Sequence, residues 1–483
     1  MAASTVQRVL GLLLALFSLT VLPPIAVSLY YGDGSSAAFV KSFLLIFAAG
    51  VLLWWPVRRE RRELRLRDGF LIVALFWIVL GTFGAAPFLF SENPRMSFTD
   101  AVFESMSGLT TTGATVLVGL ESLPPAILYY RQQLQWFGGL GLIVLAVAVL
   151  PMLGVGGMQL YRAETPGPVK NTKLTPRITQ TAKALWYIYL GITVGCALSY
   201  WLAGMSVFDA ICHGLSTVAI GGFSPRDASL GYYDSAAIHV VAIVFMFLSA
   251  INFSLHFMSW RAGSPAHYFR DAEFRAYVLF LAGLSVAVVA YLVATGHFST
   301  LGEALLEGSF QAVSMATTAG FTTDAFALWP GALPILLLLS SFVGGCAHST
   351  AGGMKVIRWL LIAKQGAREF LRLVHPSAEL PVKLGGKTVP QRIVDAVWGF
   401  FAVYIIVFAA LMLVLLMAGL DQVSAFAAVA AALNNLGPGL GEVAGGFATL
   451  PNVAKWASVC AMLLGRLEIF TLLVLITPAF WRR

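Results

Sequence analysis

Charged residues are scarce in this chain of 483 residues. Asp, Glu, Lys and Arg make up 11% of the sequence and hydrophobic residues 58%, whereas an ordinary soluble domain has about 25% charged residues. This balance excludes a water-soluble globular protein. Cysteine is also rare, and the four cysteines lie far apart, so the sequence predicts neither a zinc site nor a redox pair.

Sequence motifs of several enzyme and pump classes are missing as well. No HExxH, GxSxG or DxD-like motif occurs in the loops expected on the inner side, which weighs against a membrane enzyme acting on lipid or sugar. No nucleotide-binding loop occurs either, so the chain by itself is not expected to be an ATP-driven pump. We therefore expect a protein that is not an enzyme.

Long apolar segments, in contrast, are abundant. A helix needs about 17–25 mostly apolar residues to cross a hydrocarbon core of about 30 Å. Ten segments meet this requirement, namely 9–30, 38–57, 69–90, 133–155, 184–206, 236–258, 276–295, 331–347, 394–419 and 456–480. The first is too long for a signal peptide and is followed at once by the second, so we expect it in the mature protein. The sequence predicts an all-α polytopic membrane protein with ten transmembrane helices.

Basic residues gather in four stretches, 58–67, 162–183, 261–275 and 355–392. All four fall on one side of the membrane if the spans alternate from a cytoplasmic amino terminus, as the positive-inside rule requires. This pattern predicts a multi-pass protein of the cell inner (plasma) membrane. The net charge of +8 is then a property of the inner loops, and no nucleic-acid partner is expected.

Four moderately apolar segments, each too short to cross a bilayer, lie between successive pairs of spans on the outer side. They are 97–109, 206–218, 303–316 and 422–433, and a glycine follows each of them. With Gly113, Gly222, Gly320 and Gly437 taken as equivalent, the residues thirteen positions earlier are Asp100, Asp209, Glu307 and Ser424. An acid in the first turn of a helix is favourable, so we expect the three acids to cap short re-entrant helices and the fourth helix to have lost its acid.

Non-helical backbone at membrane depth occurs where it is buried in protein or lines a water-filled path. Four such loops in one chain therefore suggest a central pore. A ring of backbone carbonyls can replace the hydration shell of a monovalent cation, and glycine adopts the dihedrals that such a loop requires at little cost. No acidic ring occupies the loops, which disfavours a divalent-selective channel.

The stretches LTTTGAT, STVAIGGFS, TTAGFTTDA and LNNLGPGLG resemble the four pore loops of the Trk/Ktr/HKT superfamily of potassium transporters, and most closely those of its TrkH branch. The resemblance implies two leading helices followed by four M1–P–M2 pore repeats in a pseudo-fourfold arrangement. It divides the chain into 1–67, 68–162, 163–262, 263–375 and 376–483.

The resemblance also implies a potassium filter made of one glycine per loop and the two residues before it. The implied residues are Thr111, Thr112, Gly113, Ile220, Gly221, Gly222, Thr318, Ala319, Gly320, Asn435, Leu436 and Gly437. Ala319 stands where Thr is commoner in the family. Because the backbone carbonyls coordinate the ion, we expect the ring to survive this difference.

The eighth predicted span runs into the stretch 344–353, which has four glycines among ten residues and will not propagate a helix. One interpretation is a flexible kink. The resemblance instead implies an intramembrane gate loop that includes Gly345, His348, Gly352 and Gly353. His348 stands where glycine is expected; it is either inert or a source of pH sensitivity.

Arg466 lies about 15 Å into the last predicted span at 1.5 Å per residue, where an arginine is costly and normally faces a cavity or a partner. A structural ion pair with another helix is one interpretation. The resemblance implies the other, an electrostatic barrier to cations beneath the filter.

The function predicted from the sequence is that of a potassium-selective ion-conducting subunit of a Trk-type uptake system, with potassium as the transported ion. A cation/proton or cation/sodium symporter of the same architecture remains the alternative. The resemblance implies a homodimer and a cytosolic nucleotide-binding regulatory subunit of the TrkA type. The basic stretch 355–392 would bind either that subunit or anionic membrane lipid.

Overall fold

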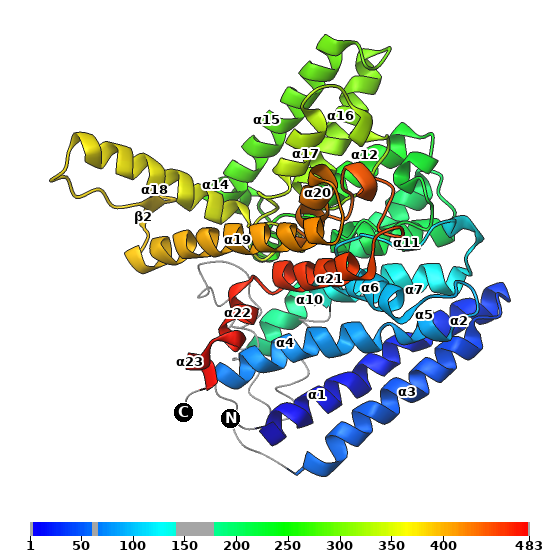
Figure 1. Cartoon of the computed structure of the whole chain (residues 1–483). Helices are drawn as coiled ribbons and strands as arrows, with labels where there is room; N and C mark the ends of the chain where they lie inside the picture. Colours follow the sequence, from blue (N-terminus) through cyan, green and yellow to red (C-terminus); the bar gives the residue numbers. More distant parts are fainter. Residues whose placement is uncertain (1–2, 60–65, 142–177, 482–483) are drawn as a thin grey trace.

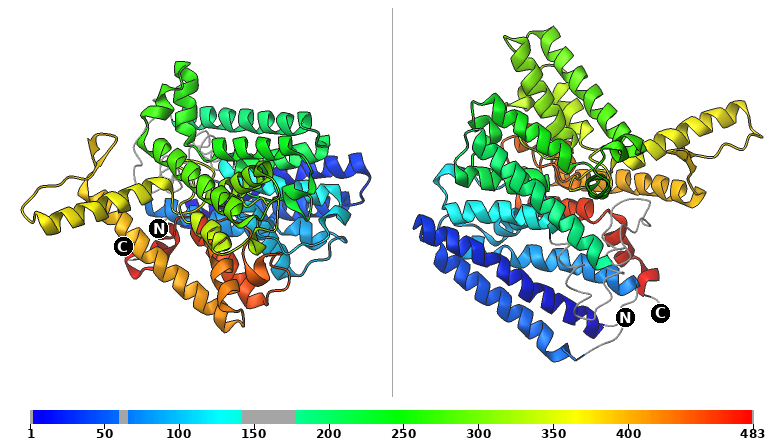
Figure 2. Two further views of the ribbon diagram at one scale, coloured as in Figure 1. Left: turned by 90° about the horizontal axis from the view of Figure 1, so that it is seen from above. Right: turned by 180° about the vertical axis from the view of Figure 1, so that it is seen from behind.

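The computed structural model describes residues 3–59, 66–141 and 178–481, and these residues form a helical protein with one short β-hairpin among them (Figure 1). The hairpin pairs β1 (Lys383–Leu384) with β2 (Lys387–Thr388) in antiparallel register. The first and last helices end close to one another, so both termini lie at the same end of the molecule (Figures 1 and 2). The all-α prediction is confirmed.

The chain begins with two long helical rods that lie side by side. Their elements are α1 (Ala3–Ser18), η1 (Leu19–Val21), α2 (Leu22–Tyr31), α3 (Ser36–Trp54) and η2 (Trp55–Val57). Two glycines let the rods approach closely: a Cβ on Gly11 would lie 2.6 Å from the backbone nitrogen of Trp54, and one on Gly50 would lie 2.5 Å from that of Ala15. Small residues are the usual means of bringing membrane helices into such contact.

The next elements repeat one order four times: a long helix, a short buried helix, a 3-10 turn and a further helix. The first unit contains α4 (Leu66–Phe83), α5 (Ala86–Phe90), α6 (Phe98–Leu109), η3 (Leu120–Ser122), α7 (Pro125–Trp136) and the π-helical η4 (Phe137–Gly141). The second contains α10 (Ile178–Leu202), α11 (Val207–Ala219), η6 (Ser229–Tyr232), α12 (Ala236–Ser249) and α13 (Phe253–Ala262). The predicted boundary between these units, at residues 162 and 163, lies outside the described residues.

The third and fourth units follow after the short helix α14 (Ala266–Arg270). The third contains α15 (Ala272–Thr295), α16 (Leu301–Ala316), η7 (Phe326–Leu328), α17 (Leu333–Ser340) and α18 (Val356–Val374). After the β-hairpin, the fourth contains α19 (Gln391–Met417), α20 (Gln422–Leu433), η8 (Gly441–Val443), α21 (Asn452–Arg466), α22 (Phe470–Ile476) and α23 (Pro478–Trp481). The outer part of α18, the hairpin and the start of α19 project from the helical body (Figures 1 and 2).

The four short helices α6, α11, α16 and α20, here called the pore helices, match the four predicted re-entrant segments to within two residues at each end. Their carboxy-terminal parts are buried. In α6 every residue from 101 to 109 is buried, and in α20 every residue from 427 to 433. The carboxy-terminal parts of the four helices therefore lie in the protein interior, whereas side chains nearer the amino-terminal ends, such as Ile211 and Leu305, are exposed.

By length and composition, six helices among the described residues could cross a membrane, or eight if each of two bent helix pairs counts as one span. These eight coincide with eight of the ten predicted spans. Of the other two, 133–155 continues from α7 into residues that are not described. The span 331–347 contains only the eight-residue helix α17 and then leaves helical structure.

Two spans that the sequence predicts as continuous helices are broken. The segment 236–258 bends by 92° between α12 and α13, and 456–480 bends by 112° between α21 and α22. At the first break, backbone groups that leave the helix bond to a distant loop, with Cys346 N donating to Ala250 O at 2.9 Å and Phe253 N to His348 O at 3.1 Å. A break in a membrane helix is tolerated when neighbouring structure satisfies the freed groups.

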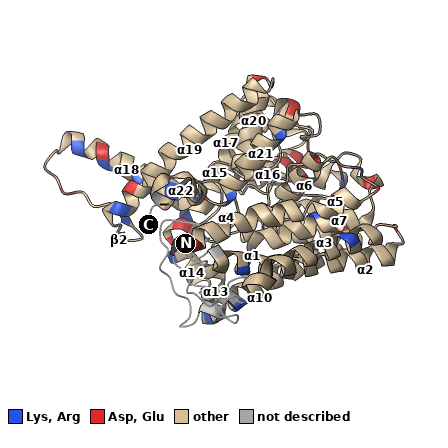
Figure 3. Ribbon diagram, turned by 60° about the horizontal axis from the view of Figure 1, so that its bottom comes forward, with Lys and Arg blue, Asp and Glu red and all other residues tan. Residues whose placement is uncertain are grey.

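Charge is distributed unevenly along the molecule. Lys and Arg residues gather at the end that carries α13, α14 and the termini and continue along α18, whereas Asp and Glu residues are prominent in the loops of the opposite end (Figure 3). The basic residues of α13, α14 and α18, which are separate in the sequence, therefore lie toward one end of the fold (Figure 3).

Candidate functional site

All four pore helices end in the same backbone motif. Each ends with a residue in the left-handed region, namely Thr111 (φ 56°), Ile220 (φ 53°), Thr318 (φ 66°) or Asn435 (φ 53°). The residue after it bonds five positions back, with Thr112 N donating to Ser107 O, Gly221 N to Ser216 O, Ala319 N to Ser314 O and Leu436 N to Ala431 O, at 2.8–2.9 Å. This is the Schellman pattern that satisfies the last carbonyls of a helix.

The predicted filter glycines follow immediately, and all four have positive φ. The values are 81° at Gly113, 77° at Gly222, 75° at Gly320 and 97° at Gly437. Over the three residues that end with the glycine, φ is positive, negative and positive again. Each pore helix therefore leads into a short extended segment with the same unusual backbone conformation. Only glycine adopts such a φ without steric cost.

The four loops touch one another in cyclic order. A Cβ on Gly113 would lie less than 3.0 Å from Gly221 O, and the same holds for Gly222 with Ala319 O, Gly320 with Leu436 O, and Gly437 with Thr112 O. Each unit thus meets the next, and the fourth meets the first, with backbone carbonyls at every junction. The twelve predicted filter residues therefore lie together in one closed ring.

Side chains supply no metal cage in the described part of the chain, where no group of three or more His, Cys, Asp and Glu residues could hold an ion. At each junction of the ring, the group that meets the filter glycine is a backbone carbonyl. Ala319 is fully buried, and its carbonyl occupies the same ring position as those of Thr112, Gly221 and Leu436. The side chain of Ala319 therefore does not displace its carbonyl from this position.

The amino-terminal ends of the pore helices are capped, but partly by other residues than the sequence predicts. Asp100 and Asp209 lie in first turns, where Ser97 and Ser206 accept their backbone N–H groups. Glu307 lies in the second turn, because the helix begins earlier, with a capping box of Thr300 and Glu303. The assignment of Glu307 as a capping residue was therefore wrong.

The fourth pore helix has kept its acid, contrary to the prediction. Asp421 is the N-cap of α20 and accepts the backbone N–H groups of Val423 and Ser424 at 2.8 and 3.1 Å. The hydrogen bond from the Ser424 hydroxyl, together with those from the two backbone N–H groups, lowers the pKa of this carboxyl. The sequence alignment missed it because the acid lies three residues before the position compared.

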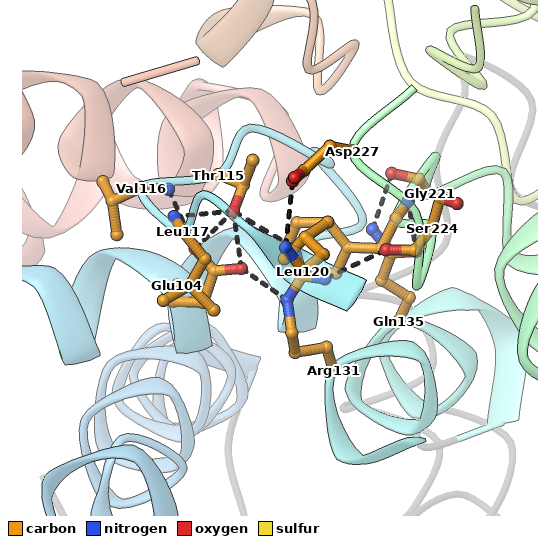
Figure 4. A network of polar contacts seen from close by, with 11 residues as sticks. Glu104, Thr115, Val116, Leu117, Leu120, Arg131, Gln135, Gly221, Ser224 and Asp227 are labelled. Carbon is orange, nitrogen blue, oxygen red and sulfur yellow. Dashed lines mark hydrogen bonds and ion pairs between the residues drawn. The ribbon is translucent and has the colours of Figure 1, made fainter. Parts of the chain in front are cut away.

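Behind the ring lies a buried ion pair that the sequence analysis did not identify (Figure 4). Arg131 Nε on α7 donates to Glu104 Oε1 on α6 at 2.7 Å, and both side chains are at most 1% exposed. Arg131 also donates to Thr115 Oγ1 and to Ser224 O, each at 3.1 Å. Thr115 and Ser224 each follow a filter glycine by two residues, so this arginine links the first loop to the second.

A glycine-rich loop, residues 344–353, lies directly against the inner side of the ring. Gly352 N donates to Thr318 Oγ1 at 2.7 Å, and Gly353 N donates to Asn434 O at 3.0 Å. The Thr350 hydroxyl donates to Val218 O at the end of α11 at 3.0 Å. This segment, here called the gate loop, therefore contacts the second, third and fourth pore units where their pore helices end.

Tight packing explains the small residues of the gate loop. A Cβ on Gly352 would lie less than 3.0 Å from Asn434 O, and one on Gly353 would lie 2.6 Å from Ser341 O. A Cβ on Gly345 would lie 2.9 Å from Ala250 O. His348 has a left-handed φ of 58°, which glycine would adopt at less cost.

A buried carboxylate at the start of α15 holds the gate loop from the side away from the ring. Glu273 Oε1 accepts Ala347 N at 2.7 Å and Ile357 N at 3.1 Å. One side chain therefore bonds the gate loop and the first turn of the helix that follows it. No local pattern points to this residue, because its partners lie 74 and 84 positions away.

Arg466 ends α21 and reaches backbone oxygens of two other units. Its guanidinium donates to Thr350 O in the gate loop at 3.3 Å, to Gly139 O at 2.9 Å and to Gly138 O at 2.5 Å. Glu468, two residues later, pairs with Arg358 at 2.6 Å. The structure therefore brings all the predicted gate residues, Gly345, His348, Gly352, Gly353 and Arg466, into or against one loop beneath the ring.

Comparisons with known proteins agree over the whole chain. The model of a family described as TrkH, cation transport protein, matches residues 35–483. The chain is 58% identical over 480 residues to the Trk system potassium uptake protein TrkH of Vibrio parahaemolyticus, covering 99% of both chains. It is 57% identical over 483 residues to TrkH of Halomonas elongata, covering 100% of both. It is 43% identical over 477 residues to TrkG of Escherichia coli, covering 99% of this chain and 98% of the other.

A solved structure extends the similarity to three dimensions. The crystal structure of the potassium transporter TrkH from Vibrio parahaemolyticus matches with a TM-score of 0.92 and 56% sequence identity, and the match covers 100% of both chains. The helical architecture described above is thus that of a known transport protein.

Proposed function

Because the chain belongs to the TrkH family of cation transport proteins, we propose that it is the potassium-conducting subunit of a Trk-type uptake system in the cell inner membrane. The family is one of transporters and not of enzymes. The observation that carries the proposal is the closed ring of four loops, in which a carbonyl of each unit abuts the filter glycine of another.

In the proposed mechanism a potassium ion exchanges its hydration shell for carbonyl oxygens of the ring, contributed by Thr111 to Gly113, Ile220 to Gly222, Thr318 to Gly320 and Asn435 to Gly437. Such oxygens suit a bare monovalent cation. Each pore helix directs its carboxy terminus, with its partial negative charge, toward the ring. The cation is therefore stabilised by dipoles from four directions and by no formal negative charge.

The gate loop and Arg466 would then restrict passage below the ring. The loop bonds to the ends of three pore helices, so an ion leaving the ring has to displace it. The guanidinium adds a positive charge on the same path, which opposes a passing cation at short range.

We favour conduction over the cation/proton or cation/sodium symport alternative. A symporter needs an acid that is free to exchange its counter-ion near the path. The buried carboxylate of Glu104 is bonded to Arg131 and to its own loop, and that of Glu273 to two backbone N–H groups. Neither is placed to exchange an ion with the ring.

The proposal includes an orientation and partners. The basic end of the molecule (Figure 3) would face the cytoplasm, with the amino terminus on that side. The protein would act as a homodimer and bind a nucleotide-binding regulatory subunit of the TrkA type at this face. Basic residues of α18, among them Lys364 and Arg372, would also bind anionic lipid headgroups.

The decisive experiment is cation flux into proteoliposomes that contain the purified chain alone, with complementation of cells that lack their own potassium uptake systems. We expect potassium and rubidium uptake that sodium competes with only weakly, and growth of the cells at low potassium. If potassium flux requires a proton or sodium gradient, the protein is a symporter and not a conducting channel. Well-folded protein that passes no monovalent cation under any condition would refute the proposal.

Loosening the gate loop should raise flux through the resting protein. Thr350→Val keeps the shape of the side chain but removes the hydroxyl that bonds to Val218 O, a buried hydrogen bond worth about 0.5–1.5 kcal/mol. We expect an increase in resting potassium flux of up to about tenfold. Shortening Gly345–Gly353 by a few residues should have a larger effect in the same direction.

Thr295→Val serves as the matched control, because it removes a hydroxyl bonded to Tyr291 O at the exposed end of α15. Its flux should equal that of the unchanged protein. If the shortened loop leaves resting flux unaltered in a normally folded protein, the loop is a hinge and not an obstruction.

A further inference from the structure

Gln135 on α7 is a buried amide that reaches the filter strand of the neighbouring unit. Its Nε2 donates to Gly221 O at 2.6 Å, and its Oε1 accepts Phe223 N at 3.1 Å (Figure 4). The side chain is fully buried. Rotating the amide by 180° would place oxygen against oxygen and N–H against N–H, so the two contacts together fix its orientation.

The carbonyl that Gln135 holds is one of the four at the junctions of the ring. Gly221 O is the atom that abuts Gly113 of the first unit. Within the described residues, no side chain donates to the equivalent carbonyls of Thr112, Ala319 or Leu436. The junction between the first and second units is therefore chemically different from the other three.

The sequence of the second loop fits this contact. The residue before the filter glycine is Thr112, Ala319 or Leu436 in three loops, but Gly221 in the second. A Cβ on Gly221 would lie less than 3.0 Å from Cδ of Gln135. Because φ at Gly221 is not positive, the backbone does not require glycine there. The glycine leaves room for the amide.

The helix α7, which carries Gln135, also contacts the second loop one helical turn before Gln135. Arg131 precedes Gln135 by four residues, so the two side chains lie on the same face of α7. The guanidinium of Arg131 donates to Ser224 O and pairs with Glu104. One face of α7 therefore bonds the second loop at Gly221, Phe223 and Ser224.

We propose that Gln135 is a positioning residue for ion selectivity, which fixes the direction of the Gly221 carbonyl; this inference rests on the proposed potassium filter. A smaller ion such as sodium requires the coordinating oxygens to move inward, and selectivity depends on how far the ring resists that movement and on the field of its carbonyls. The hydrogen bond from the Gln135 amide restrains the Gly221 carbonyl from moving inward. It also reduces the electrostatic field that this oxygen exerts on the ion. Among the described residues, the second loop is then the quarter of the ring whose junction carbonyl is held by a side chain.

The test compares Gln135→Met, which has a similar length but no donor, with Gln133→Met. Gln133 lies on the same helix and donates its amide to Thr20 O of the leading helices at 2.8 Å, so the control loses a hydrogen bond of the same kind away from the ring. In proteoliposomes, we expect potassium-over-sodium preference to fall roughly tenfold in Gln135→Met, equivalent to about 1.4 kcal/mol. The preference should remain unchanged in Gln133→Met.

Gln135→Glu provides a second readout that a merely structural role would not give. When protonated, the carboxyl can donate to Gly221 O and accept Phe223 N, as the amide does. When ionised, it can no longer donate. We expect the preference of this variant to approach that of the unchanged protein at acid pH and to fall as pH rises, relative to the unchanged protein measured alongside.

The inference is overturned if Gln135→Met keeps the preference of the unchanged protein. Should that variant not fold, a pH-independent preference in Gln135→Glu overturns it instead. Gly222→Ser measured in parallel distinguishes a failure of the role of Gln135 from a failure of the filter assignment. If Gly222→Ser loses selectivity and the Gln135 variants do not, only the role of Gln135 fails; if Gly222→Ser also keeps its selectivity, the filter assignment itself is wrong.

Discussion

Replacing any one of Gly113, Gly222, Gly320 or Gly437 with serine is expected to reduce potassium-over-sodium preference at least tenfold. A side chain at these φ values costs about 1–2 kcal/mol. In addition, each new Cβ would lie less than 3.0 Å from a backbone carbonyl of the adjoining unit. That carbonyl belongs to the ring and has to shift. The effect should be smallest at Gly437, where the gap is widest at 2.6 Å.

Gly263→Ser is the matched control for backbone strain. Gly263 has a positive φ of 59°, but no atom would lie within 4 Å of a Cβ there. This variant should lose some stability and keep its ion preference. The test is the relative uptake of potassium and sodium by proteoliposomes that contain the purified variants. Unchanged preference at all four ring positions would show that the ring is not the filter.

Arg466→Ala is expected to raise potassium flux at least tenfold in the reconstituted chain. Two unit charges about 4 Å apart repel by about 4 kcal/mol at an effective dielectric constant near 20, so the guanidinium is a large barrier to a cation in a narrow path. Removing it also removes the bonds to Thr350 O, Gly138 O and Gly139 O and loosens the gate loop. Both changes act in the same direction. Arg466→Lys retains the charge and should retain much of the barrier.

Thermal stability measured on the same variants shows whether Arg466 is an electrostatic barrier to cations or a structural residue. Arg358→Ala is the appropriate comparison, because it breaks the ion pair with Glu468 and leaves a partly buried carboxylate without its partner, which is destabilising. We expect Arg358→Ala to lower the melting temperature without the flux gain of Arg466→Ala. If Arg466→Ala behaves like Arg358→Ala, the arginine is structural. A stable Arg466→Ala variant with unchanged flux would contradict both interpretations.

The pore helices and the ring glycines could be predicted because their signals are local. The length of a short apolar segment predicts a helix that cannot cross the bilayer. The glycine that follows it indicates a backbone position that needs positive φ. The same reasoning cannot detect positive φ at Thr111 or Ile220, since these residue types do not favour it. The left-handed conformation there is imposed by the helix-ending motif and the packing around it.

The helix breaks and the buried ion pair could not be predicted, because they depend on long-range contacts. The segment 236–258 reads as one continuous apolar helix, and its break becomes favourable only because the gate loop, about 100 residues later in the sequence, bonds to Ala250 and Phe253. The pair of Glu104 and Arg131 joins residues 27 positions apart on two helices. Neither spacing has a periodicity that would reveal the contact in advance.

The contact that closes the ring has a consequence for how the protein is made. Asn435 Nδ2 donates to Thr112 Oγ1 at 3.0 Å, and these residues are 323 positions apart. Chains emerge from the ribosome amino terminus first, and segments fold largely in that order. The first three quarters of the pore are therefore in the membrane well before the fourth can join them. During that interval the polar loops have to be covered by water, lipid headgroups or other proteins, and a chain released before residue 437 would leave one side of the path open to the bilayer.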